Sequence, residues 1–145
     1  MGFFSGLKVS TPTFNVQRAV MTIVVAAIKA DGEVSEDEVI RLRSMCARSP
    51  IFAANSKEED DAVIGFADNV TTQLKSDAIV KAAAALKPEL RETAFAFACE
   101  MVLADGMVGD AEERFISSLG ATLGVSQELG SAIVQATVVR MRGAD

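Results

Sequence analysis

The sequence contains no histidine, no tryptophan and no tyrosine. Histidine is the side chain whose ordinary pKa lies nearest neutrality, and it is the commonest metal ligand. Its absence excludes Ser-His-Asp and Cys-His triads and histidine-containing zinc sites. The phosphate-binding loop and the GxSxG and HExxH motifs are absent too. We therefore expect neither catalysis nor an organic cofactor, with a carboxylate-metal hydrolase as a remote alternative.

Cysteine and long apolar runs are also scarce. The two cysteines, Cys46 and Cys99, lie in apolar helical patterns without a CxxC motif, which is typical of reduced, buried thiols. The longest apolar run, residues 19–28, is too short to cross a bilayer. Residues 1–7 lack the basic region and cleavage site of a signal peptide. We expect a cytoplasmic protein that does not insert into a membrane.

Basic residues are the minority, 14 against 20 acidic ones, which gives a net charge of −6. This balance argues against nucleic-acid binding, because such binding depends on neutralising phosphates. The length of 145 residues and the 50% hydrophobic content suit one domain with a substantial core. We expect a single domain over residues 1–145, in which residues 1–14 form a short N-terminal arm.

Apolar residues recur at spacings of three and four, and no segment alternates with period two. The sequence therefore predicts an all-α fold of seven helices. Asn15 is the expected N-cap of the first helix and Gly32 its stop. One face of this helix is expected to hold Val16, Val20, Ile23, Val24, Ala27 and Ile28. Pro88 opens the fifth helix. The expected helices run from residue 16 to Gly32 and over about 36–47, 57–74, 76–86, 88–104, 110–123 and 127–142.

One motif occurs twice. Residues 30–42 read ADGEVSEDEVIRL and residues 104–116 read ADGMVGDAEERFI. Each copy follows an apolar helix and opens an acidic one, so the chain contains two helix–turn–helix units of similar design. Together the two copies hold nine of the 20 acidic residues. The matched pairs are Ala30 and Ala104, Asp31 and Asp105, Gly32 and Gly106, Val34 and Val108, and Glu38 and Glu112, while Glu36 and Asp110 match in charge.

The shared spacing, Asp-Gly-x-Val-x-x-x-Glu, equals the second half of a calcium-binding EF-hand loop. The first half is missing, because its ligand positions fall on Ala27 and Lys29 in one copy and on Met101 and Leu103 in the other. These turns are therefore not ordinary EF-hands, and one turn alone would hold a cation poorly. A composite site would supply more ligands if the two turns converge.

The glutamates have a second interpretation as helix caps. Ser35 and Glu38 match a capping box, and Gly109 and Glu112 form a degenerate version of it. On this interpretation the acidic residues form caps and a solvated surface, and no cation is needed.

Caps do not explain the aspartates. Asp31 and Asp105 are expected at helix C-termini, where the macrodipole disfavours a carboxylate by about 0.3–1 kcal/mol. A bound cation would reverse that effect, because it could take the carboxylate, free helix carbonyls and the glutamate of the next helix as ligands. Oxygen-only donors favour calcium, magnesium or manganese. Both the cation site and the cation-free acidic surface remain open.

The duplicated motif resembles the TerB-like tellurite-resistance family. The resemblance covers nearly the whole chain: an apolar helix ending in Ala-Asp-Gly, a valine two residues later and an acidic helix, repeated after a long middle section. It implies an all-helical bacterial cytoplasmic protein that works with other Ter proteins, including a membrane-bound partner. The suspected divalent-cation ligands that it implies are Asp31, Glu38, Asp105 and Glu112, with Glu36 and Asp110 as weaker candidates.

The residues and the resemblance together lead to one functional expectation. We expect a non-catalytic interaction module of the tellurite and chemical-stress response, with acidic turns that bind a divalent cation. The alternative is a metal-free acidic adaptor whose turns dock a basic partner protein.

Overall fold

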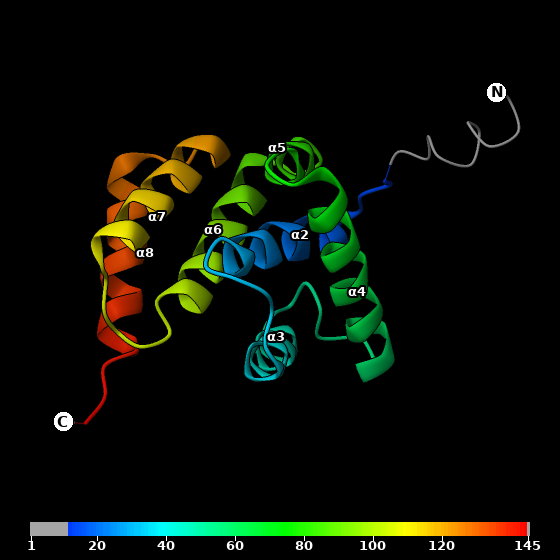
Figure 1. Cartoon of the computed structure of the whole chain (residues 1–145), viewed down its shortest axis with the longest axis horizontal. Helices are drawn as coiled ribbons and strands as arrows, with labels where there is room; N and C mark the ends of the chain where they lie inside the picture. The colour runs from blue at the N-terminus through cyan, green and yellow to red at the C-terminus, as the bar shows by residue number, and fades with distance from the viewer. Residues whose placement is uncertain (1–11, 145) are drawn as a thin grey trace, which may run out of the picture.

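The computed structural model describes residues 12–144, and it folds them into α-helices without a strand (Figure 1). The all-α fold class is confirmed, and the seven expected helices are all present. The first 11 residues of the expected N-terminal arm lie outside the described residues. The helices are α2 (Val16–Lys29), α3 (Glu36–Arg48), α4 (Lys57–Leu74), α5 (Asp77–Ala84), α6 (Pro88–Val102), α7 (Asp110–Leu123) and α8 (Gln127–Arg140).

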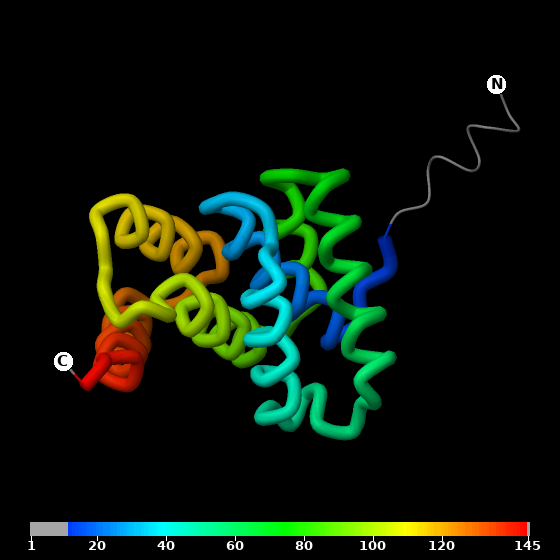
Figure 2. Tube along the Cα trace, turned by 60° about the horizontal axis from the view of Figure 1, so that its bottom comes forward, coloured from blue at the N-terminus to red at the C-terminus, as the bar shows by residue number. Residues whose placement is uncertain are grey.

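The first helix, α2, lies at the centre of the molecule and packs against α4, α5 and α6 (Figures 1 and 2). Nine of its 14 residues are buried. Burial extends beyond the one face that was expected, because residues 19–25 are buried without interruption. Val16, which was expected on that face, is 38% exposed. A helix that is apolar on most sides is stable only when neighbours cover most sides. Helices α4, α5 and α6 provide that cover.

The second central helix is α6, which packs against α2, α3, α7 and α8. Helices α2 and α6 are the first helices of the two repeat units, and they contact each other directly. The repeat units are therefore joined through these apolar helices. This contact determines where the two acidic turns lie.

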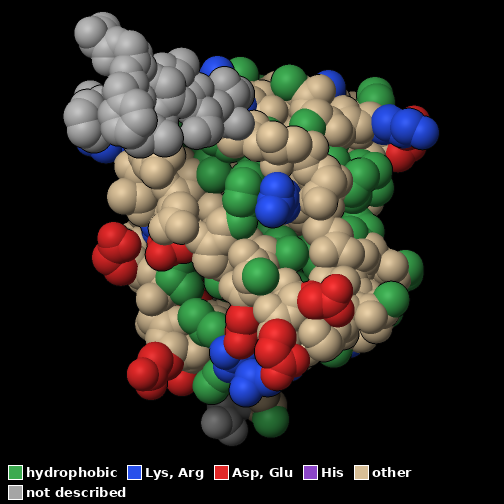
Figure 3. Space-filling view, turned by 90° about the vertical axis from the view of Figure 1, so that its right-hand side faces the viewer, with side chains coloured by type: hydrophobic (Ala, Val, Ile, Leu, Met, Phe, Trp, Pro, Cys, Tyr) green, Lys and Arg blue, Asp and Glu red, His purple; other side chains and the backbone are tan. Residues whose placement is uncertain are grey.

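The N-terminus of α4 shows how the acidic residues outside the repeats are used. The acidic run over residues 58–61 lies in the first turn and a half of this helix, where carboxylates complement the macrodipole. Asp61 accepts hydrogen bonds from Arg43 at 2.9 and 3.3 Å, and these bonds lower the pKa of its carboxyl group. Buried Asp60 accepts from Asn55 Nδ2 at 3.0 Å. On the side of the molecule that Figure 3 shows, acidic and basic side chains lie next to one another in the lower part of the view.

Both cysteines are free and buried in the core. Burial raises the pKa of each thiol from about 9 to about 12, and the charge of Asp60 adds to the effect at Cys46. The folded protein therefore holds both thiols protonated at neutral pH. This agrees with the expectation of inert, reduced cysteines.

The raised pKa values predict a pH dependence. Stability from the protonated thiols is complete below about pH 8.5 and falls as the pH rises toward 12, because the unfolded chain releases these protons first. We expect Cys46 and Cys99 to react with a thiol-specific disulfide reagent at pH 8 only after urea unfolds the protein. Rapid reaction of either thiol in the native protein would contradict this.

Among residues 12–144, no helix is both long enough and apolar enough to span a bilayer.

Candidate functional site

The first acidic turn follows α2 directly. Helix α2 ends at Lys29, and the backbone N–H of Asp31 still donates to the carbonyl of Ile28 at 3.2 Å. Asp31 therefore lies beside the last carbonyl groups of the helix, where the dipole disfavours a carboxylate. Gly32 follows with a φ of +136°, a backbone conformation that other residues rarely adopt. Within the described part of the chain, the Asp31 carboxylate makes no hydrogen bond and no ion pair.

The second turn differs from the first. Helix α6 ends at Val102, two residues before its expected end, so Asp105 lies three residues beyond the helix. Its Oδ1 accepts a hydrogen bond from the Met107 N–H at 3.0 Å, which stabilises the turn as an Asx turn does. Asp105 thus has a structural role that the sequence did not reveal. The helix dipole disfavours a carboxylate at Asp31 more strongly than at Asp105, because its effect fades within about one turn of the helix end.

The two glutamates act as caps, as one of the two interpretations predicted. Glu38 Oε1 accepts from the Ser35 N–H at 2.9 Å, and Ser35 Oγ accepts from the Glu38 N–H at 3.2 Å. In the second copy, Glu112 Oε1 accepts from the Gly109 N–H at 2.8 Å. Gly109 has no side-chain oxygen to accept a hydrogen bond from the Glu112 N–H, so this cap is half of a capping box. Within residues 12–144, the second oxygen of each glutamate makes no hydrogen bond.

The two turns converge on one surface hollow of about 490 Å³. It lies between α3 and the C-terminal end of α6, and Asp31 of the turn after α2 also lines it. One aspartate and one glutamate from each turn line it, and the two weaker candidates do not. The lining carboxylates are those of Asp31, Glu38, Asp105 and Glu112, whereas Glu36 and Asp110 are exposed outside the hollow.

Basic side chains enter the same hollow. Arg41 and Arg48 of α3 line it together with Glu100 of α6. Glu100 Oε2 accepts from Arg48 Nη2 at 2.7 Å, and its Oε1 lies 3.7 Å from Arg140 Nη1. Sequence reasoning missed both lining arginines. Their spacing of three and ten residues from Glu38 places them on the same face of α3, which was the available signal.

The hollow is not a closed metal centre. Among the described residues, no group of three cysteines, aspartates or glutamates lies close enough to hold one metal ion. The oxygen donors fit a hard divalent cation chemically, but the two turns would have to approach each other to share it. Arg41 and Arg48 also compete with a cation for the carboxylates. The arrangement is an open acidic hollow with five carboxylates and two guanidinium groups.

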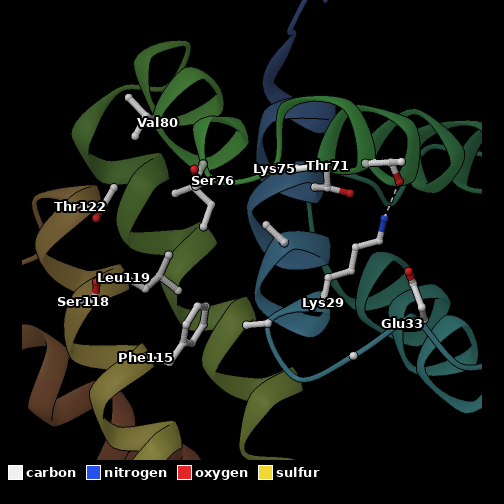
Figure 4. A pocket seen from close by; sticks show the side chains of 15 residues that line it. Lys29, Glu33, Thr71, Lys75, Ser76, Val80, Phe115, Ser118, Leu119 and Thr122 are labelled. Carbon is white, nitrogen blue, oxygen red and sulfur yellow. Dashed lines mark hydrogen bonds between the residues drawn. The ribbon is translucent and has the colours of Figure 1, made fainter.

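A second hollow, of about 710 Å³, lies on another side of the α2 C-terminus (Figure 4). Helices α2, α4, α5 and α7 line it, and Phe115 and Leu119 contribute apolar side chains. Its Lys29 is already engaged: Nζ lies 2.6 Å from Asp68 Oδ1 and donates to Thr72 Oγ1 at 3.0 Å. None of the six predicted site residues lines this hollow.

A comparison with known families gives a match to the model described as tellurite resistance protein TerB, over residues 17–133. The matched segment includes both acidic turns and all five carboxylates that line the hollow. Neither the curated proteins nor the solved structures gave a match. The family model covers well over half of the chain, and the chain therefore belongs to the TerB family of tellurite resistance proteins.

Proposed function

We propose that this TerB-family protein is a non-catalytic module of the tellurite and chemical-stress response whose two acidic turns together bind one divalent cation. Membership in the family supports a role related to tellurite resistance. The convergence of Asp31, Glu38, Asp105 and Glu112 on one hollow carries the proposal of a shared cation.

The electrostatics of the hollow favour a positive ion. Asp31 lies beside the electron-rich end of α2 and has no partner within residues 12–144, and one oxygen each of Glu38 and Glu112 is uncommitted. Calcium, magnesium or manganese would relieve this crowding, because hard cations prefer carboxylate and carbonyl oxygens. A bound cation would draw the two turns together. Part of the binding free energy is spent on that movement, so we expect weak affinity.

The second candidate is a metal-free adaptor for a basic partner protein. It is favoured because, among residues 12–144, no three carboxylates lie close enough together to hold one ion. Glu100 already pairs there with Arg48, which shows that the hollow accommodates guanidinium groups. A lysine or arginine of another Ter-type stress protein, soluble or membrane-bound, would then occupy the place of the cation.

Calorimetric titration with calcium, magnesium and manganese tests the proposal. The test variant is Asp31→Asn with Asp105→Asn, because asparagine keeps the Oδ1 acceptor for Met107 while it removes both charges. The matched control is Glu36→Gln with Asp110→Asn, which removes two charges from the same turns outside the hollow. We expect the test variant to bind at least about tenfold more weakly than the parent.

The control should bind within about twofold of the parent, because its side chains do not line the hollow. If the parent gives no heat and no shift in melting temperature at millimolar cation, the cation proposal is wrong and the adaptor remains. Equal losses in both double variants would show that net charge, and not the hollow, attracts the ion.

A further inference from the structure

Helix α8 has an unusual distribution of side chains. It lies at one end of the molecule, and among the described helices it packs mainly against α6 and α7 (Figures 1 and 2). Its one buried residue is polar Thr137, whose hydroxyl donates to the Ile133 carbonyl at 2.8 Å, whereas Val139 is 58% exposed. Ala132 and Ala136 are exposed as well. Apolar side chains therefore lie on both the inner and outer sides, as in helices that are covered on both sides.

The outer side of α8 forms an apolar groove of about 640 Å³. Val108, from the turn between α6 and α7, forms one wall, and Ala132, Ala136 and Val139 lie along the helix. Small side chains allow another backbone to approach closely, and the valines provide apolar area to bury. Arg142 lies at one end of the groove.

We propose that this groove binds α8 of a second copy of the chain, with the two helices antiparallel about a twofold axis near Gln135. The charges of the helix support this occupant and this orientation. Glu128 lies in the first turn of α8, seven residues before Gln135 and on the same side of the helix, and Arg142 lies two residues after the end of the helix, where it lines the groove. Both charged residues are exposed, and neither forms an ion pair within residues 12–144.

Antiparallel pairing about Gln135 places Glu128 of each copy beside Arg142 of the other. An isologous interface makes this contact twice and brings the two Gln135 amides together at the axis. Parallel pairing would place Glu128 beside Glu128 and Arg142 beside Arg142, and it would align the helix dipoles unfavourably. The charges at Glu128 and Arg142 therefore favour antiparallel pairing over parallel pairing. No residue lines both this groove and the acidic hollow, although Val108 belongs to the second acidic turn.

Sedimentation equilibrium over a concentration series tests the proposal on the full chain. We expect the parent to associate to twice its 15.3 kDa mass. Val139→Asp should raise the dissociation constant at least about 100-fold, because an isologous interface carries the buried charge twice. Val80→Asp is the matched control, because Val80 is 57% exposed on α5, away from the groove. It should leave the dissociation constant unchanged.

Charge exchange tests the orientation. Glu128→Arg and Arg142→Glu should each weaken association about tenfold, and the two together should restore it, because the opposite charges again face each other. Circular dichroism checks that each variant is folded. A parent that stays at 15.3 kDa at every concentration overturns the proposal. A combined variant no better than the single ones, or equal effects at Val139 and Val80, also overturns it.

Discussion

Replacement of Phe95 by alanine is expected to lower the free energy of unfolding by about 3–5 kcal/mol. Phe95 lies on α6 and is 1% exposed. Its ring packs against two glycines: a methyl group built at Gly120 of α7 would lie 3.3 Å from ring atom Cε1, and one built at Gly130 of α8 would lie 3.9 Å from the ring. Phe95 thus fills the space where α7 and α8 meet α6, and the truncated side chain leaves a cavity there.

Urea denaturation followed by circular dichroism measures this loss. Phe97→Ala on the same helix is the control, because Phe97 is only partly buried and less contact is lost. We expect the control to lose clearly less stability than Phe95→Ala. Equal losses would mean that Phe95 does not join these three helices.

Gly106→Ala is expected to cost more than about 2 kcal/mol of stability. Gly106 has a φ of +76°, and a Cβ atom there would lie 2.7 Å from the backbone oxygen of Met141, just after α8. Alanine therefore suffers both an unfavourable backbone conformation and a clash with backbone atoms that cannot rotate away. The second acidic turn is held against the end of α8 by this close approach.

Gly124→Ala separates the two contributions. Gly124 has a similar φ of +73° at the end of α7, but a Cβ atom there would have no neighbour within 4 Å. We expect it to cost about 1–2 kcal/mol, which is the backbone contribution alone. Thermal or urea denaturation of both variants gives the difference. If the two variants lose the same stability, the second turn does not approach α8 as closely as the structure shows.

Local signals in the sequence predicted much of the fold. Asn15, Ser35 and Pro88 determine helix starts through bonds or ring geometry within a few residues, so these starts could be derived without neighbours. The burial of α2 on most sides could not. Periodicity shows which side chains are apolar, whereas burial depends on which helices fold back onto them.

The candidate site was predictable to a similar degree. The repeat indicated that Asp31 and Asp105 occupy equivalent positions, but equivalence in sequence does not imply proximity. Proximity comes from the packing of α2 on α6, which is a tertiary contact. The pair between Arg48 and Glu100 spans 52 residues, and no local pattern signals it. The Asx turn of Asp105 depends on the conformation of its own loop.

The two acidic turns are proposed to bind one cation together. Amide NMR during a calcium or magnesium titration tests it most directly, with Gly32 and Gly106 reporting on the first and second turns. We predict that both amide signals shift with the same dissociation constant, and that Asp31→Asn removes the shift at Gly106 as well as at Gly32. Two results would contradict this proposal. One is a shift at only one of the two turns in the parent protein, and the other is a Gly106 shift in Asp31→Asn as large as in the parent.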